Sequence, residues 1–167
     1  DQVFDGSQET FPKILQSAGY ETAMIGKWHL KSEPTGFNYW KILKGQGEYY
    51  NPLIVDSAGE RNVEGYVTDI ITDLALETLE SRDKDKPFAM LLHHKAPHRN
   101  WMPNLKYLGA FKGKKFPLPE TFYDDYSTRS LASKESDMRI DNMFLTWDMK
   151  LRPDDIEQET GSGGSGQ

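Results

Sequence analysis

The chain has 167 residues, 37% of them apolar and 28% charged, a balance typical of a folded domain long enough to build its own hydrophobic core. Its net charge of −6 argues against a nucleic-acid or membrane-surface protein, because such proteins are usually basic. No apolar run approaches the roughly 18 residues of a membrane-spanning helix, and the absence of cysteine excludes disulfides and thiolate metal sites.

The first segment predicts a short helix. Thr10 is a suitable cap, Pro12 fits the first helical turn, and Gly19 is a typical stop. The apolar side chains between cap and stop recur at helical spacing and predict one buried face. This face would be made by Phe11, Ile14, Leu15 and Ala18.

Residues 20–26 favour a strand, which would place Lys27 and His29 in the turn beyond it. Residues 31–63 hold scattered Gly, Pro and Asn with no clear period. They predict loops, with a short strand near Leu53–Asp56.

The most regular helical pattern covers residues 65–81, with Asp69 and Asp73 opposite the apolar side. Its apolar members are Val67, Ile70, Ile71, Leu74 and Leu79. Residues 87–93 are a continuous apolar run, typical of a strand buried on both faces of a parallel sheet. We expect strands near 20–26 and 87–93 to be neighbours in a mainly parallel sheet, with the helix on one face, as in an α/β layered domain.

The carboxyl-terminal part is less regular. Residues 99–123 contain three prolines and predict loops, whereas Tyr126–Met143 predicts a helix. Its buried side would hold Leu131, Met138 and Ile140, and Pro153 would open a final short helix. We expect one domain over residues 1–156 and a flexible Gly/Ser-rich tail over 157–167, either engineered or a natural loop.

Basic side chains follow both predicted strands. Lys27 and His29 come after the first, and a second group lies within His94–His98. Cations at strand ends are suited to holding a sulfate or phosphate ester, because negative charge builds on its oxygens during hydrolysis.

The segment Thr10–Leu30 resembles the arylsulfatase family, whose members carry the pattern L…aGY.Ta.iGKWHLG at this point. Ala96-Pro97-His98 is similar to the later aPH segment of the family, and the resemblance covers most of residues 3–156. The sequence of these segments resembles the glycan sulfatases of Bacteroides-type gut bacteria. The resemblance implies the central part of a catalytic domain, in an alkaline-phosphatase-like α/β/α sandwich with a mainly parallel sheet.

The resemblance also implies catalytic roles. Lys27 matches the family lysine that contacts the formylglycine nucleophile and the sulfate oxygens. His29 matches the histidine that takes a proton from the hydrated formylglycine, and His98 matches the histidine that contacts sulfate and acts as an acid toward the leaving oxygen. Histidine as a residue type suits proton transfer because it ionises near neutral pH.

Three further residues flank this candidate site and are predicted to contact substrate: Lys95, Arg99 and Trp101. Trp28 could stack on a sugar, but a wall or core role is the commoner one for a large aromatic side chain. His94 is interpreted as a packed residue at a strand end.

No residue of the chain is predicted to bind metal. A zinc pair of His94 and His98 would need a helix, which Pro97 opposes. Asp141-Asn142 is rejected as a calcium pair because it falls in a polar helical segment rather than after an apolar strand. The family's formylglycine segment, Cys/Ser-x-Pro/Ala-x-Arg, is absent, and its calcium ligands are expected outside this chain.

The first functional hypothesis is therefore a fragment of a sulfatase that hydrolyses sulfate esters of carbohydrates and is inactive alone. The alternative is a non-catalytic module of the same ancestry that binds sulfated glycans, and a structural or partner-binding domain is a third, least favoured hypothesis. The expected partners are a sulfated carbohydrate and the remainder of the sulfatase chain, with no nucleic acid or membrane. The resemblance alone implies a periplasmic or secreted location.

Overall fold

The computed structural model describes residues 2–137, 139, 142–148 and 150, and divides the chain into two units, residues 1–98 and 99–167. The elements in chain order are α1 (Phe11–Ser17), β1 (Glu21–Lys27), β2 (Tyr39–Leu43), β3 (Leu53–Asp56), β4 (Gly59–Asn62), α2 (Val67–Ser81), β5 (Phe88–His93), η1 (Leu105–Tyr107), η2 (Glu120–Tyr123), α3 (Leu131–Lys134) and α4 (Leu145–Asp148). No helix among the described residues has the length and apolar content to cross a bilayer. The predicted tail over 157–167 lies outside the described residues.

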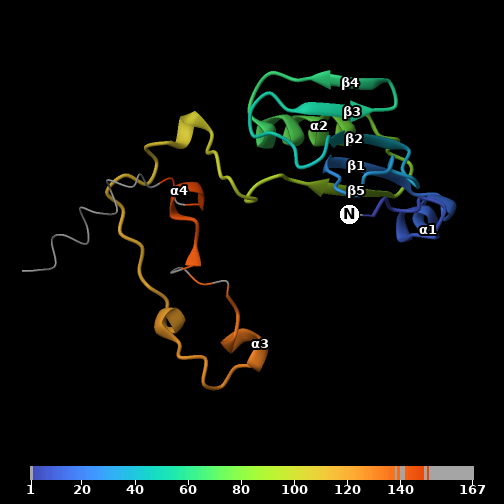
Figure 1. Cartoon of the computed structure of the whole chain (residues 1–167). Helices are drawn as coiled ribbons and strands as arrows, with labels where there is room; N and C mark the ends of the chain where they lie inside the picture. Colours follow the sequence, from blue (N-terminus) through green and yellow to red (C-terminus); the bar gives the residue numbers. More distant parts are fainter. Residues whose placement is uncertain (1, 138, 140–141, 149, 151–167) are drawn as a thin grey trace, which may run out of the picture. The chain divides into compact units, whose positions relative to one another are not determined.

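The first unit is built on a five-stranded sheet in the order β4-β3-β2-β1-β5, with α2 against one face (Figure 1). β1 runs parallel to both β2 and β5, whereas β3 pairs antiparallel with β2 and with β4. The α/β fold and the predicted parallel neighbours, β1 and β5, are confirmed. The sheet as a whole is mixed, because the two residues between β3 and β4 can only make a hairpin, and parallel strands need a longer crossover.

β1 is the central element of the core. Its residues 22–26 are all buried, and Ile25 lies on the same side as α2. From α2, Val67, Ile71 and Ala75 pack into this cluster at the i, i+4, i+8 spacing of one helical face. The predicted helix over 65–81 is therefore confirmed, with Thr78 as a further buried position that its polar side chain had concealed.

Two elements of the first unit escaped the sequence analysis, β2 and β4. β2 is only five residues long and carries Lys41 at its centre, so it shows no apolar run. It forms because β1 and β3 pair with it on both sides. The short strand predicted at Leu53–Asp56 is present as β3.

The strand predicted at 87–93 is present, but the expectation that both its faces are buried was wrong. β5 lies at the edge of the sheet, and in the described part of the chain only β1 pairs with it. Phe88 and Leu92 are 42% and 40% exposed. An apolar run predicts a strand but contains no information on what covers it. The predicted buried face of α1 is likewise partly open, with Phe11 58% exposed.

The second unit contains only short helices among its described residues, and the long helix predicted over Tyr126–Met143 was wrong. Asp124 and Asp125 accept hydrogen bonds from the backbone amides of Tyr126 and Ser127, at 2.8 and 2.7 Å. Such local turns compete with helix formation. Leu131, predicted to be buried, is 66% exposed. Met138, Ile140 and the predicted helix start at Pro153 lie outside the described residues.

The backbone at position 26 explains why the segment Gly26-Lys27-Trp28-His29 begins with glycine. Its φ of +102° lies in the left-handed region, and an added Cβ would stand 2.0 Å from the His93 carbonyl oxygen. Any other residue would force β1 and β5 apart at their carboxyl ends.

We expect Gly26→Ala to lower the free energy of unfolding by more than about 2 kcal/mol, because it adds a backbone clash to an unfavourable φ. Gly19→Ala is the matched control, since Gly19 has a φ of +88° but an added Cβ there would meet nothing within 4 Å. It should cost about 1 kcal/mol. Urea unfolding of both variants measures the difference, and equal losses would contradict the close-approach argument.

Candidate active site

The candidate site lies where the three parallel strands end. Lys27 at the end of β1 is paired in register with Leu43 at the end of β2, and Gly26 is paired with His93 at the end of β5. The segments that follow these strands therefore begin at one edge of the sheet. Open α/β sheets place their ligands at this edge.

The end of β1 is fixed by its neighbours. His93 Nδ1 donates a hydrogen bond to the Lys27 carbonyl oxygen, at 3.2 Å. Trp28 Nε1 donates to the Ser32 carbonyl oxygen at 2.7 Å, and its ring meets Phe37 edge-on with centroids 6.1 Å apart. Trp28 thus has a structural role in shaping the turn that carries His29. It also lines a cavity of about 610 Å³ together with Trp40.

His29 is exposed and contacts the β2–β3 loop, residues 44–52. Gln46 Nε2 lies 3.2 Å from His29 Nδ1 and 3.4 Å from its Nε2. The imidazole of His29 is thereby held by an amide from a different strand end. The contact links the first and second of the three segments.

Lys95 is the most buried cation of the site, with only 7% of its surface exposed. Its Nζ donates to the Gln46 carbonyl oxygen at 3.2 Å and lies 4.8 Å from the centroid of the Tyr49 ring. Burial lowers the pKa of Lys95, and the positive charge of Lys27 lowers it further, while Glu48 acts in the opposite direction. Lys27 and Lys95 are thus close enough to repel each other.

His98 is tied to the same loop. The Tyr49 hydroxyl donates to the His98 carbonyl oxygen at 2.7 Å, and the His98 amide donates to the Lys95 carbonyl oxygen at 3.1 Å. Burial raises the pKa of Tyr49, with a further contribution from Tyr66. Because Tyr49 is 3% exposed, its hydroxyl is a fixed anchor for the chain at His98.

The β2–β3 loop therefore contacts His29, Lys95 and the backbone of His98, and Lys27 lies two residues before His29 at the end of β1. The positive charges of Lys27 and Lys95 repel each other, with Glu48 acting in the opposite direction. A bound anion would relieve this repulsion. A tetrahedral oxyanion suits a cationic site of this kind, because its charge is spread over several oxygens. The catalytic roles predicted for Lys27, His29 and His98, and the convergence of their side chains on one bound group, stay predictions.

Arg99 and Trp101, predicted to contact substrate, belong to the second unit. Arg99 Nη2 lies 3.3 Å from Asp148 Oδ2, and the Asp148 side chain is 1% exposed. The Arg99 guanidinium is also 5.8 Å from the centroid of the Phe144 ring. Trp101 is 36% exposed. Arg99 thus has a structural role within its own unit, and contacts of either residue with substrate stay predictions.

The described residues offer no place for a metal. No three His, Asp or Glu side chains of the described ranges gather as a metal-binding group. His94 is half-buried, and its buried Nδ1 has no hydrogen-bond partner among the described residues. Asn142 donates from Nδ2 to the Asp137 carbonyl oxygen at 3.2 Å, while its neighbour Asp141 lies outside the described residues.

Gln46, Tyr49 and His93 are parts of the candidate site that the sequence did not predict. The signal for the first two was the strand that precedes them, since a loop after a parallel strand belongs to the same edge as Lys27. Once residues 39–43 are recognised as a strand, Gly45-Gln46-Gly47 becomes a candidate loop of the site. His93 is the last residue of an apolar run and carried no separate signal.

Comparison with known proteins identifies the family of the chain. The Sulfatase family matches residues 3–148. The chain is 54% identical over 153 residues to an N-acetylglucosamine-6-O-sulfatase of Bacteroides thetaiotaomicron, and 30% identical over 175 residues to the human N-acetylglucosamine-6-sulfatase. Its fold is similar, with a TM-score of 0.78 and 50% identity, to a solved structure in complex with the substrate D-glucosamine-2-N,6-O-disulfate. The chain belongs to the sulfatase family.

These matches cover most of this chain but only part of each relative. They include 89% of the chain and 27% of the Bacteroides protein, and 90% of the chain and 32% of the human protein. The solved structure matches 97% of this chain and 34% of its own length. The chain thus spans about a third or less of the relatives it matches.

We expect the stability difference between the wild-type chain and Lys95→Met to depend on pH. The folded pKa of Lys95 is lowered below its ordinary value of 10.5, so the unfolded chain binds more protons in the window between the two values. The free energy of unfolding of the wild type should therefore rise, relative to the variant, as pH increases through that window.

Urea unfolding at a series of alkaline pH values measures this difference. Lys86→Met is the control, since Lys86 is exposed and pairs with Asp83 at 3.5 Å. A wild-type advantage over Lys95→Met that is constant or falls with rising pH would contradict the buried position of the Lys95 ammonium.

Proposed function

We propose that this chain supplies the sulfate-binding edge of a sulfuric ester hydrolase acting on sulfated carbohydrates, specifically on 6-O-sulfated glucosamine units. The observation that carries the proposal is the placement of Lys27, His29 and His98 in segments that one loop connects. The sugar is inferred from the relatives, two of which are named for N-acetylglucosamine 6-sulfate.

The chemistry follows from charge and proton transfer. In hydrolysis the bond between sulfur and the leaving alcohol oxygen breaks, and a new bond forms between sulfur and an attacking oxygen. Lys27 would bind the sulfate oxygens on which negative charge is spread. His98 would donate a proton to the leaving oxygen, and His29, with Gln46 against its ring, would take up a proton.

Formylglycine and calcium, which the family resemblance implies, do not fit the described residues. The sequence holds no Cys/Ser-x-Pro/Ala-x-Arg segment, and the described carboxylates form no metal-binding group. We therefore assign no step to either group. We propose that both belong to a longer polypeptide that carries this segment, in the periplasm or outside the cell.

A non-catalytic module that binds sulfated glycans is the second candidate function. The same cations would bind sulfate without turnover in a protein that carries no nucleophile segment. A full-length sequence that contains the nucleophile segment would favour the enzyme over the non-catalytic module.

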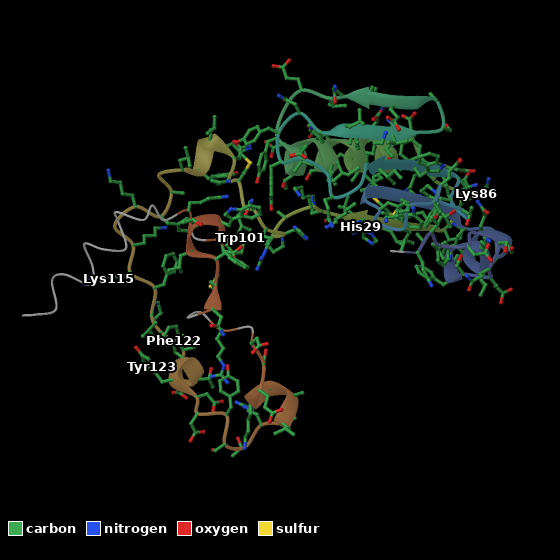
Figure 2. All side chains as sticks on the ribbon, in the orientation of Figure 1. His29, Lys86, Trp101, Lys115, Phe122 and Tyr123 are labelled. Carbon is green, nitrogen blue, oxygen red and sulfur yellow. The ribbon has the colours of Figure 1, made fainter. Side chains whose placement is uncertain are left out.

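In the full-length enzyme, Lys27→Ala, His29→Ala and His98→Ala should each lower kcat for N-acetylglucosamine 6-sulfate by about 100-fold or more, because each removes charge stabilisation or proton transfer. Lys86→Ala is the control, since Figure 2 shows Lys86 at the opposite end of the sheet from His29. Sulfate release measures the effect. Full activity in all three site variants would overturn the proposed roles.

The 167-residue chain alone should release no sulfate, because catalytic groups that act as a unit lose nearly all activity when one is removed. The measurement is sulfate release from a sulfated sugar by the purified chain. Turnover that disappears in His98→Ala would show that the chain holds its own nucleophile.

A further inference from the structure

We propose that Gln46 is a positioning residue for His29, and that the buried ammonium of Lys95 acts through Gln46 rather than on substrate. The inference rests on the proposed function for its kinetic consequences, but the geometry stands on its own. Three interactions carry it: Gln46 with His29, Lys95 with Gln46, and Tyr49 with the chain at His98.

The β2–β3 loop is held firmly enough to act as a support. The Lys44 amide donates to the Leu53 carbonyl oxygen at 3.2 Å, and the Gly47 amide donates to the Lys44 carbonyl oxygen at 3.1 Å. Gly47 has a φ of +71°, and an added Cβ would stand 2.8 Å from the Leu43 side chain. At the far end, the Val67 amide donates to the Tyr49 carbonyl oxygen at 2.8 Å, which joins the loop to α2.

Lys95 fixes the middle of this loop. Lys95 is 7% exposed, and its ammonium donates to the Gln46 carbonyl oxygen. Its charge also lies over the Tyr49 ring, where the π electrons stabilise it. Contact of Lys95 with substrate was the role predicted from the sequence, and no observation tests it; the role proposed instead is to hold the two loop residues that reach His29 and the His98 segment.

The amide of Gln46 has the property that a proton-transferring histidine requires of its neighbour. It presents a donor on one atom and an acceptor on the other, so rotation of the amide lets it pair with a neutral or a protonated imidazole. A carboxylate would favour the protonated ring only, and an alkyl group would hold neither state. Gln46 can therefore keep His29 in place throughout a cycle in which the histidine gains and loses a proton.

The direct test is NMR of the full 167-residue chain with labelled histidine, which reads the tautomer and environment of the His29 ring. Gln46→Met replaces the amide beside the His29 ring with an alkyl group. It should therefore change the signals of the His29 imidazole nitrogens. Lys95→Met should change the same signals in the same direction. Lys44→Met is the matched control on the same loop, because the Lys44 ammonium pairs with Glu60 at 2.7 Å. Unchanged His29 signals in Gln46→Met would overturn the proposal.

The second test is a double-mutant cycle in the full-length enzyme. Gln46→Met should lower kcat about tenfold with a smaller change in KM, and Lys95→Met should add little to it, because both act through one contact. Gln46→Glu should move the acidic limb of the kcat–pH profile to higher pH, because a carboxylate stabilises the protonated ring and His29 must be neutral to take up a proton. Additive losses would mean that Lys95 acts independently of Gln46 and would overturn the proposal.

The two tests separate this inference from the proposed function. If the full-length protein releases no sulfate, the NMR measurement still decides whether Gln46 and Lys95 position His29. If the enzyme is active but the His29 signals do not respond to either variant, the proposed function stands and the positioning role fails. A variant that fails to fold is recognised by loss of the dispersed spectrum. If Gln46→Met fails to fold, Gln46→Asn replaces it, because it keeps the amide on a shorter side chain. Gln46→Asn should change the His29 imidazole nitrogen signals less than complete loss of the amide would.

Discussion

The close approach of β1 and β5 at Gly26 is the constraint on which the rest of the first unit depends. Because Gly26 has no side chain, the His93 carbonyl oxygen can lie where a Cβ would otherwise clash with it. The two strands then end together, and His93 can hold the Lys27 backbone. A backbone requirement near the carboxyl end of β1 thus determines where the basic side chains begin.

The site combines a rigid support with an unfavourable charge arrangement. The support is apolar and buried, since Ile25, Leu43 and Tyr49 belong to one cluster with α2. The charges above it are not balanced, because Lys27 and the buried Lys95 repel each other, and Glu48 is the carboxylate that opposes this effect. Burial of the support stabilises the fold and offsets the repulsion. The repulsion in turn favours an anionic ligand over an empty site.

The sequence predicted the parts of this arrangement that are encoded locally. The regular spacing in 65–81 and the apolar runs ending near Lys27 and His93 are visible within single segments, and so are the basic residues that follow them. β2 was missed because its stability comes from pairing on both sides, and Gln46 and Tyr49 were missed with it. The long helix expected over Tyr126–Met143 failed because Asp124 and Asp125 form local turns. The role of Lys95 depends on burial, which no neighbouring residue in the sequence reveals.

The central claim is that the carboxyl edge of the sheet binds a tetrahedral oxyanion. The most direct measurement is an NMR titration of the chain with sodium sulfate, compared with sodium chloride at equal ionic strength. The account predicts saturable shifts of the Lys27, His29 and His98 signals with sulfate and not with chloride. Shifts confined to the exposed basic segment at Lys112–Lys115, or the same response to both salts, would contradict it.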